Sequence, residues 1–239
     1  MKVGRRLALA AVPLLAAGCA PAGVTSQGRA THDLYTLFLI VAAVVFGVVA
    51  VWLLWSIVRY RRRDDRLPEQ THGNTRLELL WTAIPLGLVI FLFVVTMRAQ
   101  STVLSDPPSP LTVDVTAFTW SWQFDYEGSD RRVIGGPGPG NVPELVVPVG
   151  VPVHVKLRSA DVVHSFYVPR ALFKRQAIPG TTNQFDMTFQ RVGLYHGQCA
   201  QFCGIAHSDM LFRVRVVPPN EFQRFLTGNR GGTTPGSGT

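Results

Sequence analysis

Charged residues and cysteines are both scarce in this sequence. Only 16% of the 239 residues are charged, while 47% are hydrophobic, whereas about a quarter of a soluble globular domain is charged. The shortfall points to membrane segments. The net charge of +8 could indicate nucleic-acid binding, but no basic stripe interleaved with aromatic residues is present, which excludes that class. No CxxCH motif occurs in the sequence, so we expect no c-type haem attached to this chain.

Two uncharged apolar runs, 34–58 and 79–97, are each long enough to cross the hydrocarbon core of a bilayer. The stretch that joins them is rich in arginine: Arg59, Arg61, Arg62, Arg63, Arg66 and Arg76. Cytoplasmic loops carry such positive charge, so we place this loop inside the cell and both flanking parts of the chain outside. The sequence predicts a transmembrane hairpin over 30–100, with helices at about 34–58 and 77–98, in a bacterial cell membrane.

The two ends of the sequence differ from the rest. Residues 1–19 have a basic start, an apolar core and small residues before Cys19, which indicates a signal peptide. The run 15–19 also resembles a lipobox, which would make Cys19 a lipidated N-terminus; the alternative is an ordinary signal peptide with an incidental cysteine. Residues 228–239 have the composition of a disordered tail.

Beyond the proline-rich linker 106–110 the hydrophobic period changes to two. Every odd position from Val147 to Leu157 is apolar, which is the pattern of a strand with one buried face. Similar alternation occurs in three further segments, and the phase slips near Phe118, which predicts a bulge or corner there. We expect a loop over 128–143, no helix, and an antiparallel β-sandwich over 111–219.

One loop near the end of this domain holds Cys199, Cys203, His207 and Met210 within twelve positions, and His164 stands 35 residues before Cys199. A disulfide is one interpretation, because the domain faces an oxidising compartment. Zinc is a second, although it has little need of methionine. Copper fits best, because thiolate, imidazole and thioether are the ligands that select it. The second thiolate leaves room for a second copper.

With these residues the chain resembles the CuA-bearing subunit II of cytochrome c oxidase. The spacing Cys199-x₃-Cys203-x₃-His207-x₂-Met210, with His164 upstream, matches the family's dinuclear copper motif. Four further segments match in the same order along the chain: Glu78 to Pro85, Trp120 to Tyr126, Asp161 to Phe166, and Ala177 to Gly180. The resemblance extends from the first membrane helix to Val217.

The resemblance implies a fold and a ligand set. The fold would be a two-helix transmembrane anchor followed by a cupredoxin-like antiparallel β-sandwich on the extracytoplasmic side. Cys199 and Cys203 would bridge two coppers, with His164 and His207 binding one each. The remaining ligands would be the thioether of Met210 on one copper and the backbone carbonyl of Gln201 on the other.

The resemblance also implies an activity. The protein would accept electrons from cytochrome c and pass them to haem in the catalytic subunit I, which holds haem and copper and reduces oxygen to water with proton translocation. Trp120 matches the tryptophan that receives the electron, although a tryptophan in a strand also often packs in the core. Glu78 matches a glutamate at the mouth of a proton-uptake channel. The alternative is that this carboxylate only stabilises the start of the helix through its interaction with the helix dipole.

Two features depart from the family pattern. Gln201 stands where a glutamate is usual, and that glutamate side chain binds magnesium or manganese in the family. Hard cations prefer anionic oxygen, so a magnesium site is doubtful here. From Leu111 onward there are 12 lysines and arginines against 9 aspartates and glutamates. A domain that is not net acidic favours a donor less basic than usual, or docking through the aromatic patch.

Two other functions remain open from the sequence. The chain could be the CuA subunit of a nitric oxide reductase or of a divergent haem–copper oxidase. It could also be a copper carrier, which would need cysteine, histidine and methionine but neither Trp120, Glu78 nor a two-helix anchor.

Overall fold

The computed structural model describes residues 22–61, 73–105, 108–136 and 140–228. The described residues form two compact units, one helical and one built on β-strands, and each is considered by itself. The predicted signal peptide with Cys19 lies outside the described residues. The same is true of all but the first residue of the predicted disordered tail.

The helical unit contains most of two long helices: α2 covers Ser26–Arg59 and α3 covers Thr75–Val103. By length and composition both are candidate membrane spans. Each begins before the apolar run that marked it in the sequence, because a polar side chain caps it. Asn74 Oδ1 accepts hydrogen bonds from the backbone N–H groups of Arg76 and Leu77 at 3.1 and 3.3 Å, which satisfies two otherwise unpaired donors at the start of α3.

The start of α2 packs against the β unit, a contact that the sequence does not reveal. Thr25 Oγ1 caps the helix by accepting the Gly28 N–H at 2.9 Å, and it donates to the Ala171 carbonyl at 3.2 Å. Thr25 also pairs with Phe189 in an isolated bridge. A Cβ on Gly28 would lie 2.3 Å from the Ala171 carbonyl oxygen. Residues 22–32 therefore group with the β unit rather than with the rest of the helix.

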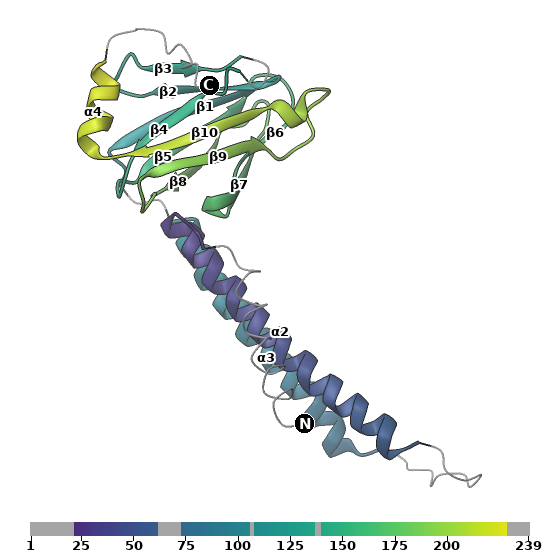
Figure 1. Cartoon of the computed structure of the whole chain (residues 1–239). Helices are drawn as coiled ribbons and strands as arrows, with labels where there is room; N and C mark the ends of the chain where they lie inside the picture. Colours follow the sequence, from purple (N-terminus) through teal and green to yellow (C-terminus); the bar gives the residue numbers. More distant parts are fainter. Residues whose placement is uncertain (1–21, 62–72, 106–107, 137–139, 229–239) are drawn as a thin grey trace, which may run out of the picture. The chain divides into compact units, whose positions relative to one another are not determined.

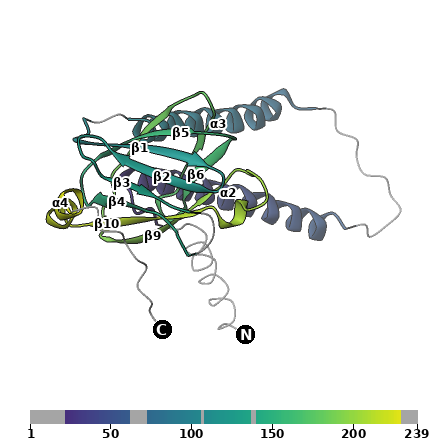
Figure 2. The ribbon, with the colours of Figure 1, turned by 90° about the horizontal axis from the view of Figure 1, so that it is seen from above.

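The β unit is a sandwich of two five-stranded sheets, as predicted (Figures 1 and 2). The first sheet has the order β3-β2-β1-β5-β8, formed by Arg132–Ile134, Ser121–Tyr126, Leu111–Phe118, Val153–Ser159 and Asn183–Met187. The second has the order β4-β10-β9-β6-β7, formed by Glu144–Pro148, Leu211–Val217, Gly193–Cys199, His164–Val168 and Phe173–Ala177.

The two sheets are mixed, which corrects the prediction of a purely antiparallel sandwich. β1 runs parallel to β5, with Val113 opposite Val155, and β10 runs parallel to β4, with Val214 opposite Leu145. All other strand pairs are antiparallel. Alternation of apolar and polar residues reports which face of a strand is buried but carries no information on strand direction, so this feature was not predictable from the pattern.

Three local features also differ from the sequence predictions. The phase slip near Phe118 is a tight hairpin, since β1 ends there and pairs Phe118 with Ser121 of β2. The segment 128–143, expected to be a loop, contains β3. The domain ends in a helix that was not predicted, α4 (Pro219–Thr227), which buries Phe222 in the core.

Aromatic side chains fill the space between the sheets. Trp122, Phe166 and Phe212 are fully buried, with ring centroids of Phe166 and Phe212 4.5 Å apart and those of Trp122 and Phe212 5.1 Å apart. The buried hydroxyl of Tyr126 donates to the Val146 carbonyl at 2.9 Å and accepts the Val146 N–H at 2.7 Å. This bond ties β2 of one sheet to β4 of the other, so the sandwich is a rigid support for the loops at its ends.

Candidate metal centre

Residues 200–210 form the loop between β9 and β10, and its base is closed tightly. The N–H of Cys199 donates to the Met210 carbonyl at 3.0 Å, so the last residue of β9 lies beside the residue that precedes β10. Within the loop, the short helix η2 (His207–Asp209) turns the chain back, and the His207 N–H donates to the Gly204 carbonyl at 3.2 Å. The loop therefore gathers side chains that are up to eleven positions apart.

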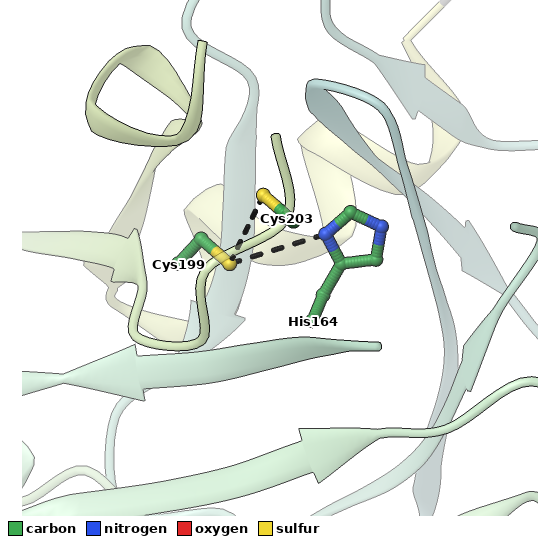
Figure 3. Close-up of side chains that lie close together, drawn as sticks. All are labelled: His164, Cys199 and Cys203. Atoms are coloured by element: carbon green, nitrogen blue, oxygen red, sulfur yellow. Dashed lines mark hydrogen bonds between the residues drawn. The ribbon is translucent and has the colours of Figure 1, made fainter. Parts of the chain in front are cut away.

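Five side chains form a continuous cluster of sulfur and nitrogen atoms. Cys199 Sγ lies 3.8 Å from Cys203 Sγ and 3.9 Å from His164 Nδ1 (Figure 3). Cys203 Sγ lies 3.4 Å from His207 Nδ1 and 3.7 Å from Met210 Sδ. The structure thus brings together every side chain that the sequence proposed as a copper ligand.

The two thiols are free, so the disulfide considered from the sequence is not formed. Their sulfur atoms lie 3.8 Å apart, against about 2.05 Å in a disulfide bond. The backbone carbonyl oxygen of Gln201 lies 3.2 Å from Cys199 Sγ. The backbone carbonyl of Gln201 therefore faces the sulfur cluster.

The cluster is almost closed to solvent. His164 and Met210 have no exposed surface, Cys199 and Cys203 are 4% and 7% exposed, and His207 is half-buried. One donor atom each from His164, Cys199 and Cys203 lies within 4.8 Å of the others. Buried thiol, imidazole and thioether groups fit a soft or borderline metal and give no support to a hard cation such as magnesium at this point.

Asp161 orients the histidine of the cluster, a role that the sequence analysis missed. Its Oδ1 accepts a hydrogen bond from His164 Nε2 at 2.7 Å, which leaves Nδ1 directed at Cys199 (Figure 3). A carboxylate on the second ring nitrogen fixes the tautomer of a metal-binding histidine and makes it a stronger donor. The signal for this role was the three-residue spacing to His164 within a segment already singled out for its resemblance.

The two cysteine thiols differ in pKa. Burial raises the pKa of Cys199, but hydrogen bonds, chiefly with His164, outweigh burial and bring the pKa below its usual range. Burial and the neighbouring Cys199 thiolate raise the pKa of Cys203. Burial lowers the pKa of His164, but its hydrogen bonds with Cys199 and Asp161 outweigh burial and raise it. Without a metal the pair therefore favours one thiolate, and a metal that takes both sulfurs must displace a proton.

Trp120 lies beside the cluster, in the turn between β1 and β2. Its indole N–H donates to the Cys203 carbonyl at 3.1 Å, and its side chain is half-buried. Gly204, the next residue, has φ +118°, and a Cβ there would lie 3.1 Å from the indole nitrogen. A glycine at 204 therefore permits both the backbone conformation and the close approach of the indole.

Glu78 belongs to the helical unit, in the first turn of α3, where its side chain is exposed. Its N–H donates to the Asn74 carbonyl at 3.0 Å, and its own carbonyl accepts the hydroxyl of Thr82 at 2.8 Å. Glu78 and the sulfur cluster thus belong to different units of the structure.

Fold and donor set together define the class of protein: a cupredoxin-like β-sandwich with a copper-type thiol, imidazole and thioether cluster, on a chain with two candidate transmembrane helices. Family models match both the helical and the β-stranded part of the chain. Residues 20–99 match the family model described as cytochrome c oxidase subunit II, transmembrane domain, and residues 141–217 match the one described as its periplasmic domain.

Curated relatives carry the same description. A probable cytochrome c oxidase subunit 2 of Nocardia farcinica is 32% identical, over 98% of this chain and 82% of the relative. A probable cytochrome c oxidase subunit 2 of Streptomyces avermitilis is 37% identical, over 77% of this chain and 70% of the relative. The chain belongs to the cytochrome c oxidase subunit II family, whose periplasmic domain carries a copper site.

Among solved structures, the chain is similar to the periplasmic domain of subunit II of the cytochrome oxidase of Bradyrhizobium japonicum. The identity is 31%, the TM-score is 0.46, and the match covers 51% of this chain and 94% of the solved chain.

Proposed function

We propose that this chain accepts electrons from cytochrome c at a dinuclear copper centre and passes them to haem in the catalytic subunit of an oxidase that reduces oxygen to water. The observation that carries the proposal is the buried cluster itself. Two thiols 3.8 Å apart, each with an imidazole nitrogen within 3.9 Å, provide the symmetric donor set that two shared coppers require.

Six residues would hold the metals. Cys199 and Cys203 would bridge them, with one imidazole for each copper from His164 and His207. The other donors would be the thioether of Met210 and the backbone carbonyl of Gln201. When bound, the copper pair supplies reversible one-electron transfer.

The protein contributes rigidity and exclusion of water. The loop is fixed at its base by the Cys199 N–H bond to the Met210 carbonyl, and Asp161 holds the ring of His164. A donor set that is already in place needs little rearrangement when its charge changes, which lowers the cost of a one-electron step. Trp120 would accept the electron, because its indole is hydrogen-bonded to the carbonyl of a bridging cysteine.

The same burial argues against a copper carrier. A carrier must hand its metal to another protein, which requires donors that an incoming ligand can reach. Here Met210 and His164 have no exposed surface and both cysteines are nearly closed to solvent. Slow release of metal is suited to a resident redox centre and unsuited to a delivery role.

The helical unit supports the remaining parts of the proposal. Its two candidate spans would anchor the chain in the bacterial cell membrane, with the β unit on the extracytoplasmic side. Glu78, exposed in the first turn of α3, would serve as the entrance for protons taken up by the catalytic subunit. The complex would use protons that enter there for reduction of oxygen to water and for proton translocation.

Copper analysis of the full chain, purified with its oxidase partners, tests the proposal. We expect two coppers per chain and an electron paramagnetic resonance spectrum in which one unpaired electron is shared by both. Cys203→Ser should abolish that spectrum, whereas Ser208→Ala, an exposed change in the same loop, should preserve it. One copper, zinc, or a disulfide in the native complex would refute the proposal. Oxygen consumption measured beside nitric oxide consumption distinguishes an oxidase from a nitric oxide reductase.

A further inference from the structure

A small cavity lies where β7 and β8, the edge strands of the two sheets, contact each other. Residues 103–105, at the end of α3, line one side of it, and His154 of β5, Arg175 of β7 and Asp186 of β8 line the others. All of its lining residues belong to the β unit, and none of them belongs to the sulfur cluster. Its volume of about 200 Å³ is below the roughly 300–1,000 Å³ of sites for drug-sized ligands, so it suits a small polar group.

Arg175 brings positive charge to this cavity. It lies between Phe173 and Ala177 on the inward face of β7, since both of these side chains are buried and alternate residues of a strand share a face. Its Nε is buried, and no atom in the described part of the chain is its hydrogen-bond partner. Buried polar groups in native proteins nearly always have a partner, and a guanidinium group matches the oxygens of a phosphate. The arginine is therefore placed to bind an anionic group that enters the cavity.

Asp186 brings a carboxyl group to the same cavity. It is 3% exposed, and its Oδ1 lies 3.3 Å from Nδ1 of His154. A carboxylate accepts several hydrogen bonds at once, so this contact does not exclude a further one from an ammonium group. The Nε of Arg175 takes no part in the pairing. A ligand that carries both a phosphate and an amine would match the two side chains, whereas a simple anion would also meet the like charge of the carboxylate.

The cavity begins at the residue where α3 would leave the membrane. The 29 residues of α3 make a helix about 43 Å long at about 1.5 Å per residue, and a bilayer with its headgroup layers is about 40–45 Å thick. Val103, the last residue of α3, would thus lie at the outer surface of the headgroup layer, and it lines the cavity. Phospholipid headgroups are the molecules that present phosphate groups at that depth.

Resting on the membrane placement in the proposed function, we propose that this cavity binds the phosphoethanolamine headgroup of a phospholipid from the extracytoplasmic leaflet. Arg175 donates hydrogen bonds to the phosphate, and the carboxylate of Asp186 accepts one from the ammonium group. The lipid links the β unit to the membrane surface at the end of α3. Because a ligand that binds only the folded protein stabilises it, the bound lipid also raises the thermal stability of the β unit.

The test uses the complete oxidase, washed in detergent to remove lipid, and native mass spectrometry to count the lipid molecules that bind again. The probes are short-chain phosphatidylethanolamine and phosphatidylglycerol, which has the phosphate without the amine, with inorganic phosphate as a competitor. Wild type should bind one phosphatidylethanolamine at this site about tenfold more tightly than phosphatidylglycerol, because the amine adds a hydrogen bond between charged groups. Arg175→Gln should lose this molecule, whereas Asp186→Asn should bind the two lipids equally well.

Lys174 provides a matched control, since it precedes Arg175 in β7, is exposed and lies on the opposite face of the strand. Lys174→Gln removes the same charge and should bind lipid like wild type. An unaltered copper spectrum verifies that each variant is folded. If Arg175→Gln does not fold, the preference of wild type for phosphatidylethanolamine still decides between a headgroup site and a simple anion site. If wild type binds this lipid but lacks the copper pair, the proposed function fails and the lipid site stands.

Three results would overturn the lipid proposal. Equal binding of phosphatidylethanolamine by wild type and Arg175→Gln would place the lipid elsewhere on the complex. Equal affinity of wild type for the two lipids, or displacement of both by inorganic phosphate, would identify a general anion site. Loss of the catalytic subunit on purification of Arg175→Gln would identify the cavity as an intersubunit contact.

Discussion

Asp161 connects the two parts of the site on which the proposed electron acceptance would depend. One of its carboxylate oxygens lies 2.7 Å from Nε2 of His164, and the other accepts the backbone N–H of Thr119 at 2.7 Å. A single side chain thus orients a metal ligand and holds the turn that presents Trp120. Partial burial raises the pKa of Asp161, but hydrogen bonds from His164, Thr119 and Val162 outweigh it and keep the pKa well below its usual range. The group is a carboxylate at neutral pH.

Asp161→Asn should weaken the metal centre without emptying it. The amide keeps the shape of the side chain but removes the negative charge that strengthens His164 as a donor. Loss of such a partner typically costs about 10- to 100-fold in metal affinity or activity. Competition with a copper chelator measures the affinity, and Asp209→Asn, an exposed change in the copper loop, is the control. Equal copper retention in the two variants would show that Asp161 does not support His164.

Trp120→Phe should slow electron delivery while leaving the copper centre intact. Phenylalanine keeps an aromatic ring but cannot donate the hydrogen bond that reaches the Cys203 carbonyl at 3.1 Å. We expect reduction of the centre by cytochrome c to slow by about tenfold, which is about 1.4 kcal/mol in activation free energy. Stopped-flow absorbance of the copper centre gives this rate. Tyr195→Phe, which removes a hydroxyl bound to the Arg191 carbonyl, should react like wild type. An unchanged rate in Trp120→Phe would show that Trp120 contributes only packing and is not the electron entry.

Gly204→Ala should disturb the centre more than the same change at another glycine with positive φ. At Gly204 the new methyl group meets the indole of Trp120 and the backbone has φ +118°, whereas at Gly150, with φ +75°, the space around it is open. Strain of this kind costs about 1–3 kcal/mol. Gly204→Ala should therefore lower both the copper content and the thermal denaturation midpoint, and Gly150→Ala should lower the midpoint alone. Full copper content in Gly204→Ala would contradict the close packing of loop and indole.

Much of the fold and of the clustering at the candidate site was predictable because each rests on a short-range pattern. Uncharged runs marked the two apolar helices, and alternation of apolar residues marked about half of the strands: β1, β2, β5, β8 and β10. The spacing of Cys199, Cys203, His207 and Met210 predicted that these side chains lie together, because one closed loop contains them. His164 was a candidate from its residue type alone, and only the resemblance gave it a ligand role, since no local pattern links residues 35 positions apart.

What sequence did not reveal depends on contacts between distant segments. The parallel pairing of β1 with β5 cannot be inferred from the alternation of apolar and polar residues. The hydrogen bond between Thr25 and Ala171 joins residues 146 positions apart. Asp161 was quoted as part of a motif without a role, because its hydrogen bonds are visible only when the β1–β2 turn is placed beside it. The helix α4 was missed because nine residues give too short a window for periodicity to be distinguished from chance.

Gln201→Glu should create a site for a hard cation without changing the copper centre. The backbone carbonyl of the residue lies 3.2 Å from Cys199 Sγ, and this atom is the same in glutamine and glutamate. A carboxylate offers the anionic oxygen that magnesium and manganese prefer, whereas the amide of Gln201 is a weaker ligand. In the complete oxidase grown with manganese, the substituted enzyme should retain Mn²⁺ by electron paramagnetic resonance and wild type should not. Manganese held at full occupancy by wild type would refute this prediction.

Glu78→Gln should slow turnover without affecting copper. Glu78 is the one carboxylate within α3, and its side chain is exposed in the first helical turn, where a proton could be collected from water. Glutamine is nearly isosteric but cannot carry a proton, so steady-state oxygen consumption should fall by about tenfold or more, while reduction of the copper centre by cytochrome c keeps its rate. Asp33→Asn, at the only carboxylate within α2, is the matched control and should turn over normally. Because helix-dipole stabilisation is worth about 0.3–1 kcal/mol, loss of that contribution alone would lower thermal stability slightly and leave turnover unchanged. Normal turnover in Glu78→Gln would therefore show that Glu78 only stabilises the start of the helix and has no role in proton uptake.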